Sequence, residues 1–182
     1  MEQISKVITV EEHFMSEKVN GEYQKLLEKK NLTLAQKEKA NFIQQFVAKG
    51  EITEVGEKRL EFMETHGIDC QILSYGNNSP SYLDPKQAVV LCQMANEELA
   101  GYCKQYPGNF YGFAVLPVGD TGAALTELER TVKTLGLKGI IFNGAYQESY
   151  FDEDRFFPIF EMAQELKVPV MLHPGEVPTE VA

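Results

Sequence analysis

The sequence predicts an α/β fold built on a parallel sheet. Five short segments are apolar at nearly every position, which is typical of strands that are buried on both faces of such a sheet. They are residues 6–10, 70–74, 110–116, 137–142 and 168–172. Helical segments separate them, and the next apolar segment follows each helix at once, as in βαβ units. Right-handed crossovers then leave two architectures, a doubly wound sheet or a barrel.

Capping residues and glycines mark the ends of the predicted helices. Asp84 followed by Pro85 is a typical helix start, and Asp120 marks another. Gly67 and Gly136 each follow a helical segment and can adopt the left-handed conformation that ends a helix. The predicted helices are residues 57–66, 85–106, 123–135 and 152–166. No GxGxxG motif follows the first apolar segment, so the sequence does not favour a dinucleotide-binding sheet.

A long connection, residues 14–53, separates the first apolar segment from the helix at 57–66. Such a length is unusual for a plain loop. Residues 34–49 have the spacing of a helix and end at Gly50, so we expect a helical insertion. In a barrel, an insertion after strand 1 lies on the catalytic face and could contribute to the active site. The alternative is that the insertion is a surface elaboration with no function.

Composition excludes several classes of protein. The chain has 182 residues, with 17 Lys and Arg against 27 Asp and Glu, and a formal charge of −10. One domain is expected at this length, and the acidic balance argues against nucleic-acid and anionic membrane partners. Cysteines 70, 92 and 103 have no metal-site spacing, which favours reduced thiols in a cytoplasmic protein.

Two of the 3 histidines follow predicted strands. His13 follows the first strand and His173 the fifth, at the carboxyl ends where functional groups collect in parallel α/β folds. Strict alternation along a strand would place Glu11 on the same face as His13, with Glu12 opposite. Two imidazoles and a carboxylate suit Zn²⁺ or a similar divalent ion. The alternative is a hydrogen-bonded structural role, which we expect for His66 near a helix end.

The chain also resembles the amidohydrolase-related (amidohydrolase 2) metal enzymes over nearly its whole length. The motifs that carry this resemblance are Glu11-Glu12-His13-Phe14, Arg59-Leu60-x-x-Met63-x-x-His66-Gly67-Ile68, Phe113-Ala114-x-Leu116-Pro117, Gly139 to Asn143-Gly144, and Val168-Pro169-x-x-Leu172-His173-Pro174. The branch that it resembles most contains the decarboxylases of γ-resorcylate, 2,3-dihydroxybenzoate and aminocarboxymuconate semialdehyde. Glu11, where the wider superfamily has Asp, agrees with that branch.

The resemblance implies a (β/α)8 TIM barrel, of which residues 1–182 would supply about the first five βα units within a single domain. It implies a divalent metal, with zinc first and manganese second. Glu11 and His13 match the ligands on strand 1, and His173 matches the ligand on strand 5. Asn143 matches a residue near the substrate pocket.

The resemblance further implies proton-handling His and Asp residues on later strands, which we expect beyond Ala182, so no catalytic residue is assigned within the chain. A barrel that lacks its last strands has two open edges. We therefore expect the chain to associate with copies of itself, as a homo-oligomer, or to be poorly soluble.

The function expected from the resemblance is metal-dependent, non-oxidative decarboxylation of a hydroxylated aromatic or enol-type carboxylic acid. Three aromatic residues near strand ends could line the binding site for the substrate ring, namely Phe14, Tyr75 and Phe142. Aromatic residues at such positions commonly belong to the core instead. Two alternatives remain open. One is a hydrolase of the same superfamily acting on an amide, lactone or ester, and the other is an inert, self-associating fragment.

Overall fold

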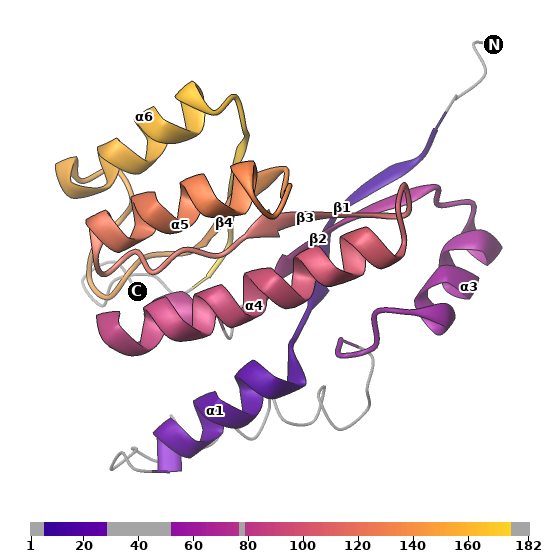
Figure 1. Cartoon of the computed structure of the whole chain (residues 1–182), viewed down its shortest axis with the longest axis horizontal. Coiled ribbons are helices and arrows are strands. Elements are labelled where there is room, and N and C mark those ends of the chain that lie inside the picture. Colours follow the sequence, from indigo (N-terminus) through magenta and orange to yellow (C-terminus); the bar gives the residue numbers. More distant parts are fainter. Residues whose placement is uncertain (1–5, 29–51, 77–78, 176–182) are drawn as a thin grey trace.

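The computed structural model describes residues 6–28, 52–76 and 79–175, which form a five-stranded parallel sheet flanked by helices (Figure 1). The strands are β1 (Ile8–Phe14), β2 (Cys70–Tyr75), β3 (Phe110–Ala114), β4 (Gly139–Asn143) and β5 (Val170–His173). The helices are α1 (Glu17–Glu28), α3 (Glu57–His66), α4 (Pro85–Gln105), α5 (Thr121–Lys133) and α6 (Phe157–Glu165), with short 3-10 turns at Pro80–Tyr82 and Asp154–Phe156.

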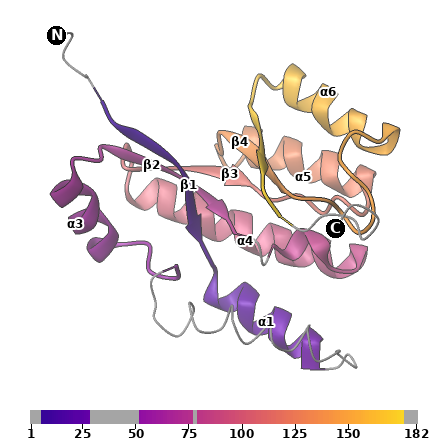
Figure 2. The ribbon, with the colours of Figure 1, turned by 180° about the vertical axis from the view of Figure 1, so that it is seen from behind.

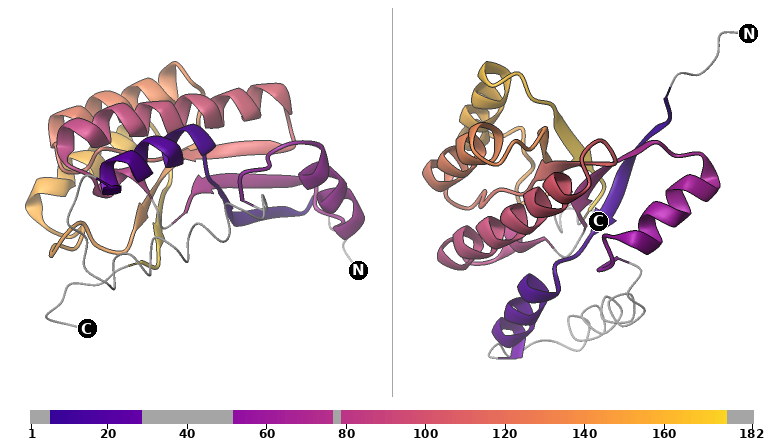
Figure 3. Two further views of the ribbon diagram at one scale, coloured as in Figure 1. Left: turned by 90° about the horizontal axis from the view of Figure 1, so that it is seen from below. Right: turned by 45° about the vertical axis from the view of Figure 1, so that its right-hand side comes forward.

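The order of the strands decides between the two predicted architectures. The strands lie in the order β1-β2-β3-β4-β5, with no reversal, which excludes a doubly wound sheet. Right-handed crossovers in this order place successive helices on the same face, and α4, α5 and α6 lie side by side outside the sheet (Figure 3). The sheet curls away from them. The prediction of about five βα units of a TIM barrel is therefore confirmed.

The predicted strands are confirmed, but β1 extends beyond its predicted end and carries the Glu11–Phe14 segment inside the sheet. Seen from behind, β1 and β5 form the two borders of the sheet (Figure 2). Each of them pairs with one neighbour only among the described residues. The described residues therefore leave both borders of this half-barrel open.

The capping residues predicted at Asp84, Asp120 and Gly67 are confirmed, whereas the helix predicted from residue 152 begins only at Phe157, after a 3-10 turn. The carboxylate of Asp84 accepts a hydrogen bond from the backbone N–H of Lys86 at 3.2 Å, and α4 begins with Pro85. Asp120 accepts one from the N–H of Ala123 at 3.0 Å and caps α5. Gly67 ends α3 in the left-handed conformation with φ 67°. The sequence was sufficient to predict these caps because each cap provides hydrogen-bond partners to backbone groups within one turn of the helix.

Helix α1 was not predicted. The hydroxyl of Ser16 caps it by accepting a hydrogen bond from the N–H of Val19 at 3.1 Å. Val19 and Tyr23, four residues apart, lie on the side of the helix that packs against the core, and the rest of α1 is largely polar. The short apolar stripe was the signal available in the sequence. The helix predicted for residues 34–49 lies outside the described residues.

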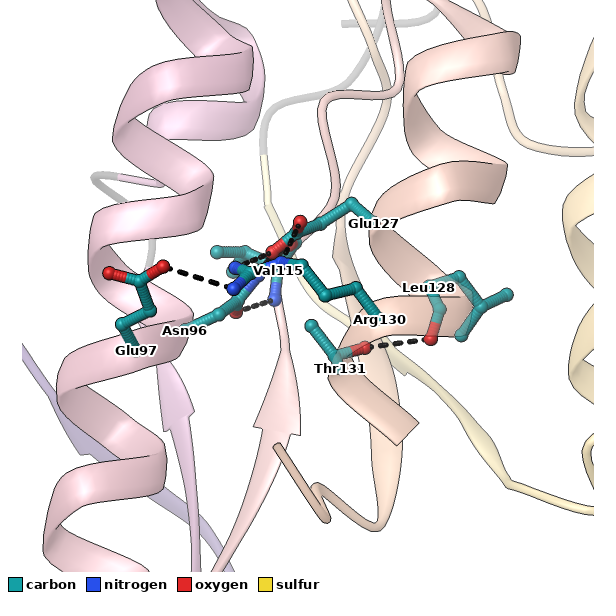
Figure 4. A network of polar contacts seen from close by, with 7 residues as sticks. All are labelled: Asn96, Glu97, Val115, Glu127, Leu128, Arg130 and Thr131. Atoms are coloured by element: carbon teal, nitrogen blue, oxygen red, sulfur yellow. Dashed lines mark hydrogen bonds and ion pairs between the residues drawn. The ribbon is translucent and has the colours of Figure 1, made fainter. Parts of the chain in front are cut away.

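A buried polar network joins α4, α5 and the end of β3 (Figure 4). The amide nitrogen of Asn96 donates to the carbonyl of Val115 at 2.9 Å and to the carboxylate of Glu127 at 2.8 Å, and its oxygen accepts from the N–H of Val115 at 3.0 Å. Arg130 completes the network with two hydrogen bonds of 2.8 Å to the Glu127 carboxylate. The network satisfies buried backbone groups just beyond the last residue of β3.

None of the helices in the described part of the chain has the length and apolar character that crossing a membrane requires.

Candidate metal centre

The imidazoles of His13 and His173 meet at the carboxyl ends of β1 and β5. Their Nε2 atoms are 3.0 Å apart, and the ring centroids are 4.7 Å apart with an interplanar angle of 75°. In a flat sheet, β1 and β5 would be separated by four strand spacings, about 19 Å. The curl of the sheet is therefore what brings these two side chains into contact.

His13 is held from two sides. Its Nδ1 atom lies 3.2 Å from the hydroxyl of Ser74, which is the residue paired with His13 in the register of β1 and β2. Its backbone carbonyl accepts a hydrogen bond from the guanidinium of Arg59 on α3 at 3.0 Å. No role for Ser74 or Arg59 was expected from the sequence. The available signals were a polar residue at the end of an apolar strand and an arginine within the second motif.

His173 is held by backbone groups. Its Nδ1 atom lies 2.6 Å from the carbonyl oxygen of Pro174, and its own carbonyl accepts a hydrogen bond from the N–H of Gly144 at 2.8 Å. A Cβ atom on Gly175 would lie 2.7 Å from the nitrogen of Gly144, so the close approach of these two segments requires glycine. The segment after β5 is thus fixed against the segment after β4.

The electrostatics favour an uncharged His13. Partial burial lowers the pKa of His13 below the usual value for histidine, and the neighbouring His173 acts in the same direction. The carboxylates of Glu11 and Glu12 act in the opposite direction without cancelling the effect. A neutral imidazole is the form that binds a metal ion, because the ligating nitrogen must have its lone pair free.

Glu11 does not join the two imidazoles in the structure. Across the described residues, no three His, Cys, Asp or Glu side chains lie close enough together to hold an ion. A bulge between Thr9 and Glu12 inserts one extra residue into β1, and Glu11 has a positive φ of 62°. Strict alternation therefore does not hold across Glu11, because a bulge changes the direction of the side chains that follow. Beyond the bulge, Glu12 lines a cleft together with Arg59 and Tyr102.

Asn143 lies beside His173 in the register of β4 and β5 and is buried, with 4% of its surface exposed. Its amide nitrogen donates a long hydrogen bond of 3.5 Å to the carbonyl of Tyr75. Its Oδ1 atom is buried and has no hydrogen-bond partner within the part of the chain that the structure describes. A buried oxygen in this condition can accept a hydrogen bond from a ligand.

The aromatic residues expected to wall a substrate lie in the hydrophobic core. Phe14 and Tyr75 are almost fully buried and pack edge to face at 5.3 Å, and Phe142 stacks on Phe151 at 4.2 Å. Phe14 follows His13, and Tyr75 follows Ser74, so alternation directs these two rings to the opposite face of the sheet. Burial also raises the pKa of Tyr75. The two rings therefore pack in the core of the described structure, and their role beside a substrate stays a prediction.

His66 lies at the end of α3, with its Nδ1 atom 2.8 Å from the carbonyl of Phe62 and its ring stacked on the Phe62 ring. These contacts agree with the structural role expected for it.

The sequence and the fold of the chain are similar to those of known proteins. A family model described as amidohydrolase matches residues 45–181. The γ-resorcylate decarboxylase of Rhizobium radiobacter is 36% identical over 132 residues, which cover 68% of this chain and 40% of that protein. A 2,6-dihydroxybenzoate decarboxylase solved with 2,6-dihydroxybenzoate is similar with a TM-score of 0.73 and 29% identity, over 93% of this chain and 50% of that one.

A dihydroxybenzoic acid decarboxylase from Polaromonas sp. JS666, solved with manganese and the inhibitor 2-nitroresorcinol, has a TM-score of 0.73 and 30% identity over 93% of this chain and 49% of that one. The chain thus spans about 40% of the length of the γ-resorcylate decarboxylase and about half the length of the two solved structures.

Proposed function

The chain belongs to the amidohydrolase family, and we propose that it forms the metal-binding part of a barrel enzyme that removes CO₂ from a hydroxylated aromatic acid. In this proposal residues 1–182 are the N-terminal part of one barrel domain. The observation that carries it is the contact between the Nε2 atoms of His13 and His173 at 3.0 Å. The similarity to decarboxylases of dihydroxybenzoic acids supports the choice of reaction.

The two imidazoles fit a divalent ion. Ligand nitrogens lie about 2.1 Å from such an ion, so two nitrogens 3.0 Å apart can both reach it. His13 and His173 would hold the ion, with Glu11 as the third ligand. Support for Glu11 comes from its bulge and its positive φ, because bulges and strained backbone occur often beside functional sites.

We propose manganese or zinc as the ion. Imidazole and carboxylate ligands suit both metals, and the manganese bound by the Polaromonas enzyme supports the first. When bound, the ion supplies a positive charge that polarises the oxygens of a carboxylate and a neighbouring hydroxyl group.

The roles proposed for residues of this chain are ligation and substrate orientation. Glu11, His13 and His173 are ligands, and the unpartnered Oδ1 atom of Asn143 accepts a hydrogen bond from a substrate hydroxyl group. In the reaction, the ring carbon that bears the carboxylate takes up a proton, the bond to the carboxylate breaks, and its electron pair restores the aromatic ring as CO₂ leaves. None of these four residues is assigned to the proton transfer.

The reaction is tested with 2,6-dihydroxybenzoate and the manganese-supplemented barrel enzyme of which this chain forms the metal-binding part. We expect release of one CO₂ for each resorcinol formed, and no ring opening of a lactone. Asn143→Ala should raise KM about tenfold, because it removes one hydrogen bond to a substrate hydroxyl group. Hydrolysis of the lactone without CO₂ release would instead assign the chain to the hydrolases of the family.

Self-association is a second proposal, favoured by the open borders of the sheet. Ile8 and Val10 on β1 are 52% and 55% exposed, and Leu172 on β5 is 67% exposed. Apolar edge strands readily pair with another chain. We expect the sedimentation coefficient of the chain to rise with concentration, and Val10→Lys to reduce that rise. A dilution-stable monomer would contradict this expectation.

A further inference from the structure

The two imidazoles of the proposed metal centre differ in what their Nδ1 atoms contact. The Nδ1 atom of His173 faces the carbonyl oxygen of Pro174 at 2.6 Å. A carbonyl can only accept a hydrogen bond, so the proton of a neutral His173 is on Nδ1, and its Nε2 atom has a free lone pair. The Nδ1 atom of His13 instead faces the hydroxyl of Ser74 at 3.2 Å, and a hydroxyl can either donate or accept.

Without metal, the contact between the two Nε2 atoms at 3.0 Å needs one proton. Because His173 has its proton on Nδ1, the proton between the rings belongs to Nε2 of His13. The Nδ1 atom of a neutral His13 is then an acceptor, and the Ser74 hydroxyl donates to it. This assignment gives every ring nitrogen of the pair a hydrogen-bond partner of the correct kind.

With metal, both Nε2 atoms must present lone pairs to the ion. His173 already satisfies this requirement, whereas His13 must have its proton on Nδ1. Resting on the metal centre proposed above, we propose that Ser74 is a positioning residue that supports both tautomers of His13. As metal binds, the N–H bond at Nε2 of His13 is lost to water and one forms at Nδ1, so the ring stays neutral. The Ser74 hydroxyl rotates from donor to acceptor.

The surroundings of Ser74 make the side chain hard to replace. Ser74 is 1% exposed and lies directly opposite His13 in the register of the two strands. Removing the hydroxyl would leave the Nδ1–H group of metal-bound His13 facing a buried methyl group. A buried N–H group without a hydrogen-bond acceptor is unfavourable, so metal binding would be weakened. A carboxylate or carbonyl here could only accept, and would hold His13 in one tautomer as Pro174 holds His173.

The tautomers can be read directly by NMR. Long-range ¹H–¹⁵N spectra of the full chain labelled with ¹⁵N-histidine distinguish protonated from unprotonated ring nitrogens, and His66→Ala and His13→Ala assign the 3 rings. In metal-free protein we expect His13 protonated at Nε2 and His173 at Nδ1. After addition of Zn²⁺, which is diamagnetic, we expect both rings protonated at Nδ1. A metal-free His13 already protonated at Nδ1 would overturn the exchange of tautomers.

The role of Ser74 is tested by titrating Zn²⁺ into variants. Ser74→Ala should weaken binding by about tenfold or more, the usual effect of losing such a partner of a metal ligand. Ser74→Thr keeps the hydroxyl and should bind within about threefold of the original protein. Ser81→Ala is the matched control, because this buried serine contacts Ser79 and Cys92 and not the imidazoles. It should leave Zn²⁺ affinity unchanged.

The outcomes separate the two proposals. Equal Zn²⁺ affinity of folded Ser74→Ala and the original protein would overturn the role of Ser74 and leave the metal centre intact. A loss of affinity in Ser81→Ala as large as in Ser74→Ala would also overturn it, because the effect would then be one of general destabilisation. If the original protein binds neither Zn²⁺ nor Mn²⁺, both proposals fail together.

Discussion

His13→Ala is expected to abolish metal binding by the chain. The substitution removes one of the two nitrogens that meet at 3.0 Å, and an ion left with a single imidazole loses most of its binding free energy. We expect about one Mn²⁺ or Zn²⁺ for each original chain after dialysis, little or none for the variant, and an affinity weaker by about a hundredfold or more. Elemental analysis and calorimetric titration measure these quantities. In the barrel enzyme of which the chain forms part, CO₂ release should fall to background in parallel.

His66→Ala is the matched control for this experiment. It also removes an imidazole, but His66 contacts Phe62 at the end of α3 and takes no part in the contact between His13 and His173. We expect the metal content of His66→Ala to equal that of the original protein. Retention of full metal content by His13→Ala would contradict the proposed centre, and so would an equal loss in both variants.

Asn96→Ala is expected to give the largest loss of stability among the substitutions considered. The amide of Asn96 bonds to both backbone groups of Val115 and to the Glu127 carboxylate, and Asn96 and Glu127 are 1% and 2% exposed. Alanine would leave these buried groups without that partner. The free energy of unfolding should fall by about 3 kcal/mol, since each unmet buried polar group costs about 1–3 kcal/mol. Urea denaturation followed by circular dichroism measures the change.

Glu97→Ala provides the comparison within the same network. Glu97 binds Arg130 at 3.0 Å, but its side chain is 61% exposed. An exposed ion pair contributes little, so the free energy of unfolding should change by less than about 1 kcal/mol. If Asn96→Ala and Glu97→Ala were equally destabilising, the buried amide would not have the importance that the structure gives it.

Much of the fold could be predicted because its signals are local. Each signal depends on residues within a few positions of one another. This holds for the apolar strands, for the N-caps at Asp84 and Asp120, and for the C-cap at Gly67. The two histidines were identified for the same reason, since each stands beside an apolar segment. Helix α1 was not predicted because its apolar stripe is short and most of its residues are polar.

The face that a side chain occupies was less predictable. Alternation of side chains along β1 correctly places His13 and Glu12 on opposite faces of the sheet, but it does not hold at Glu11. The bulge there is a shift in the pairing of β1 with β2, which the sequence of β1 does not reveal. Phe14 and Tyr75 stand at strand ends like the imidazoles, yet they face the core. Their position along the chain indicated proximity to the site, and only the pairing of the strands showed which side of the sheet they occupy.

The amino-acid pattern alone was enough to predict a series of parallel βα units with a histidine at the end of the first strand and another at the end of the fifth. The folded chain was needed to show that these histidines touch, that Ser74 faces one of them, and that Asn96 and Glu127 share a buried network. Such contacts join residues 31 to 160 positions apart. They depend on strand register and on the curvature of the whole sheet, which arise from the packing of all its units and are encoded in no single segment.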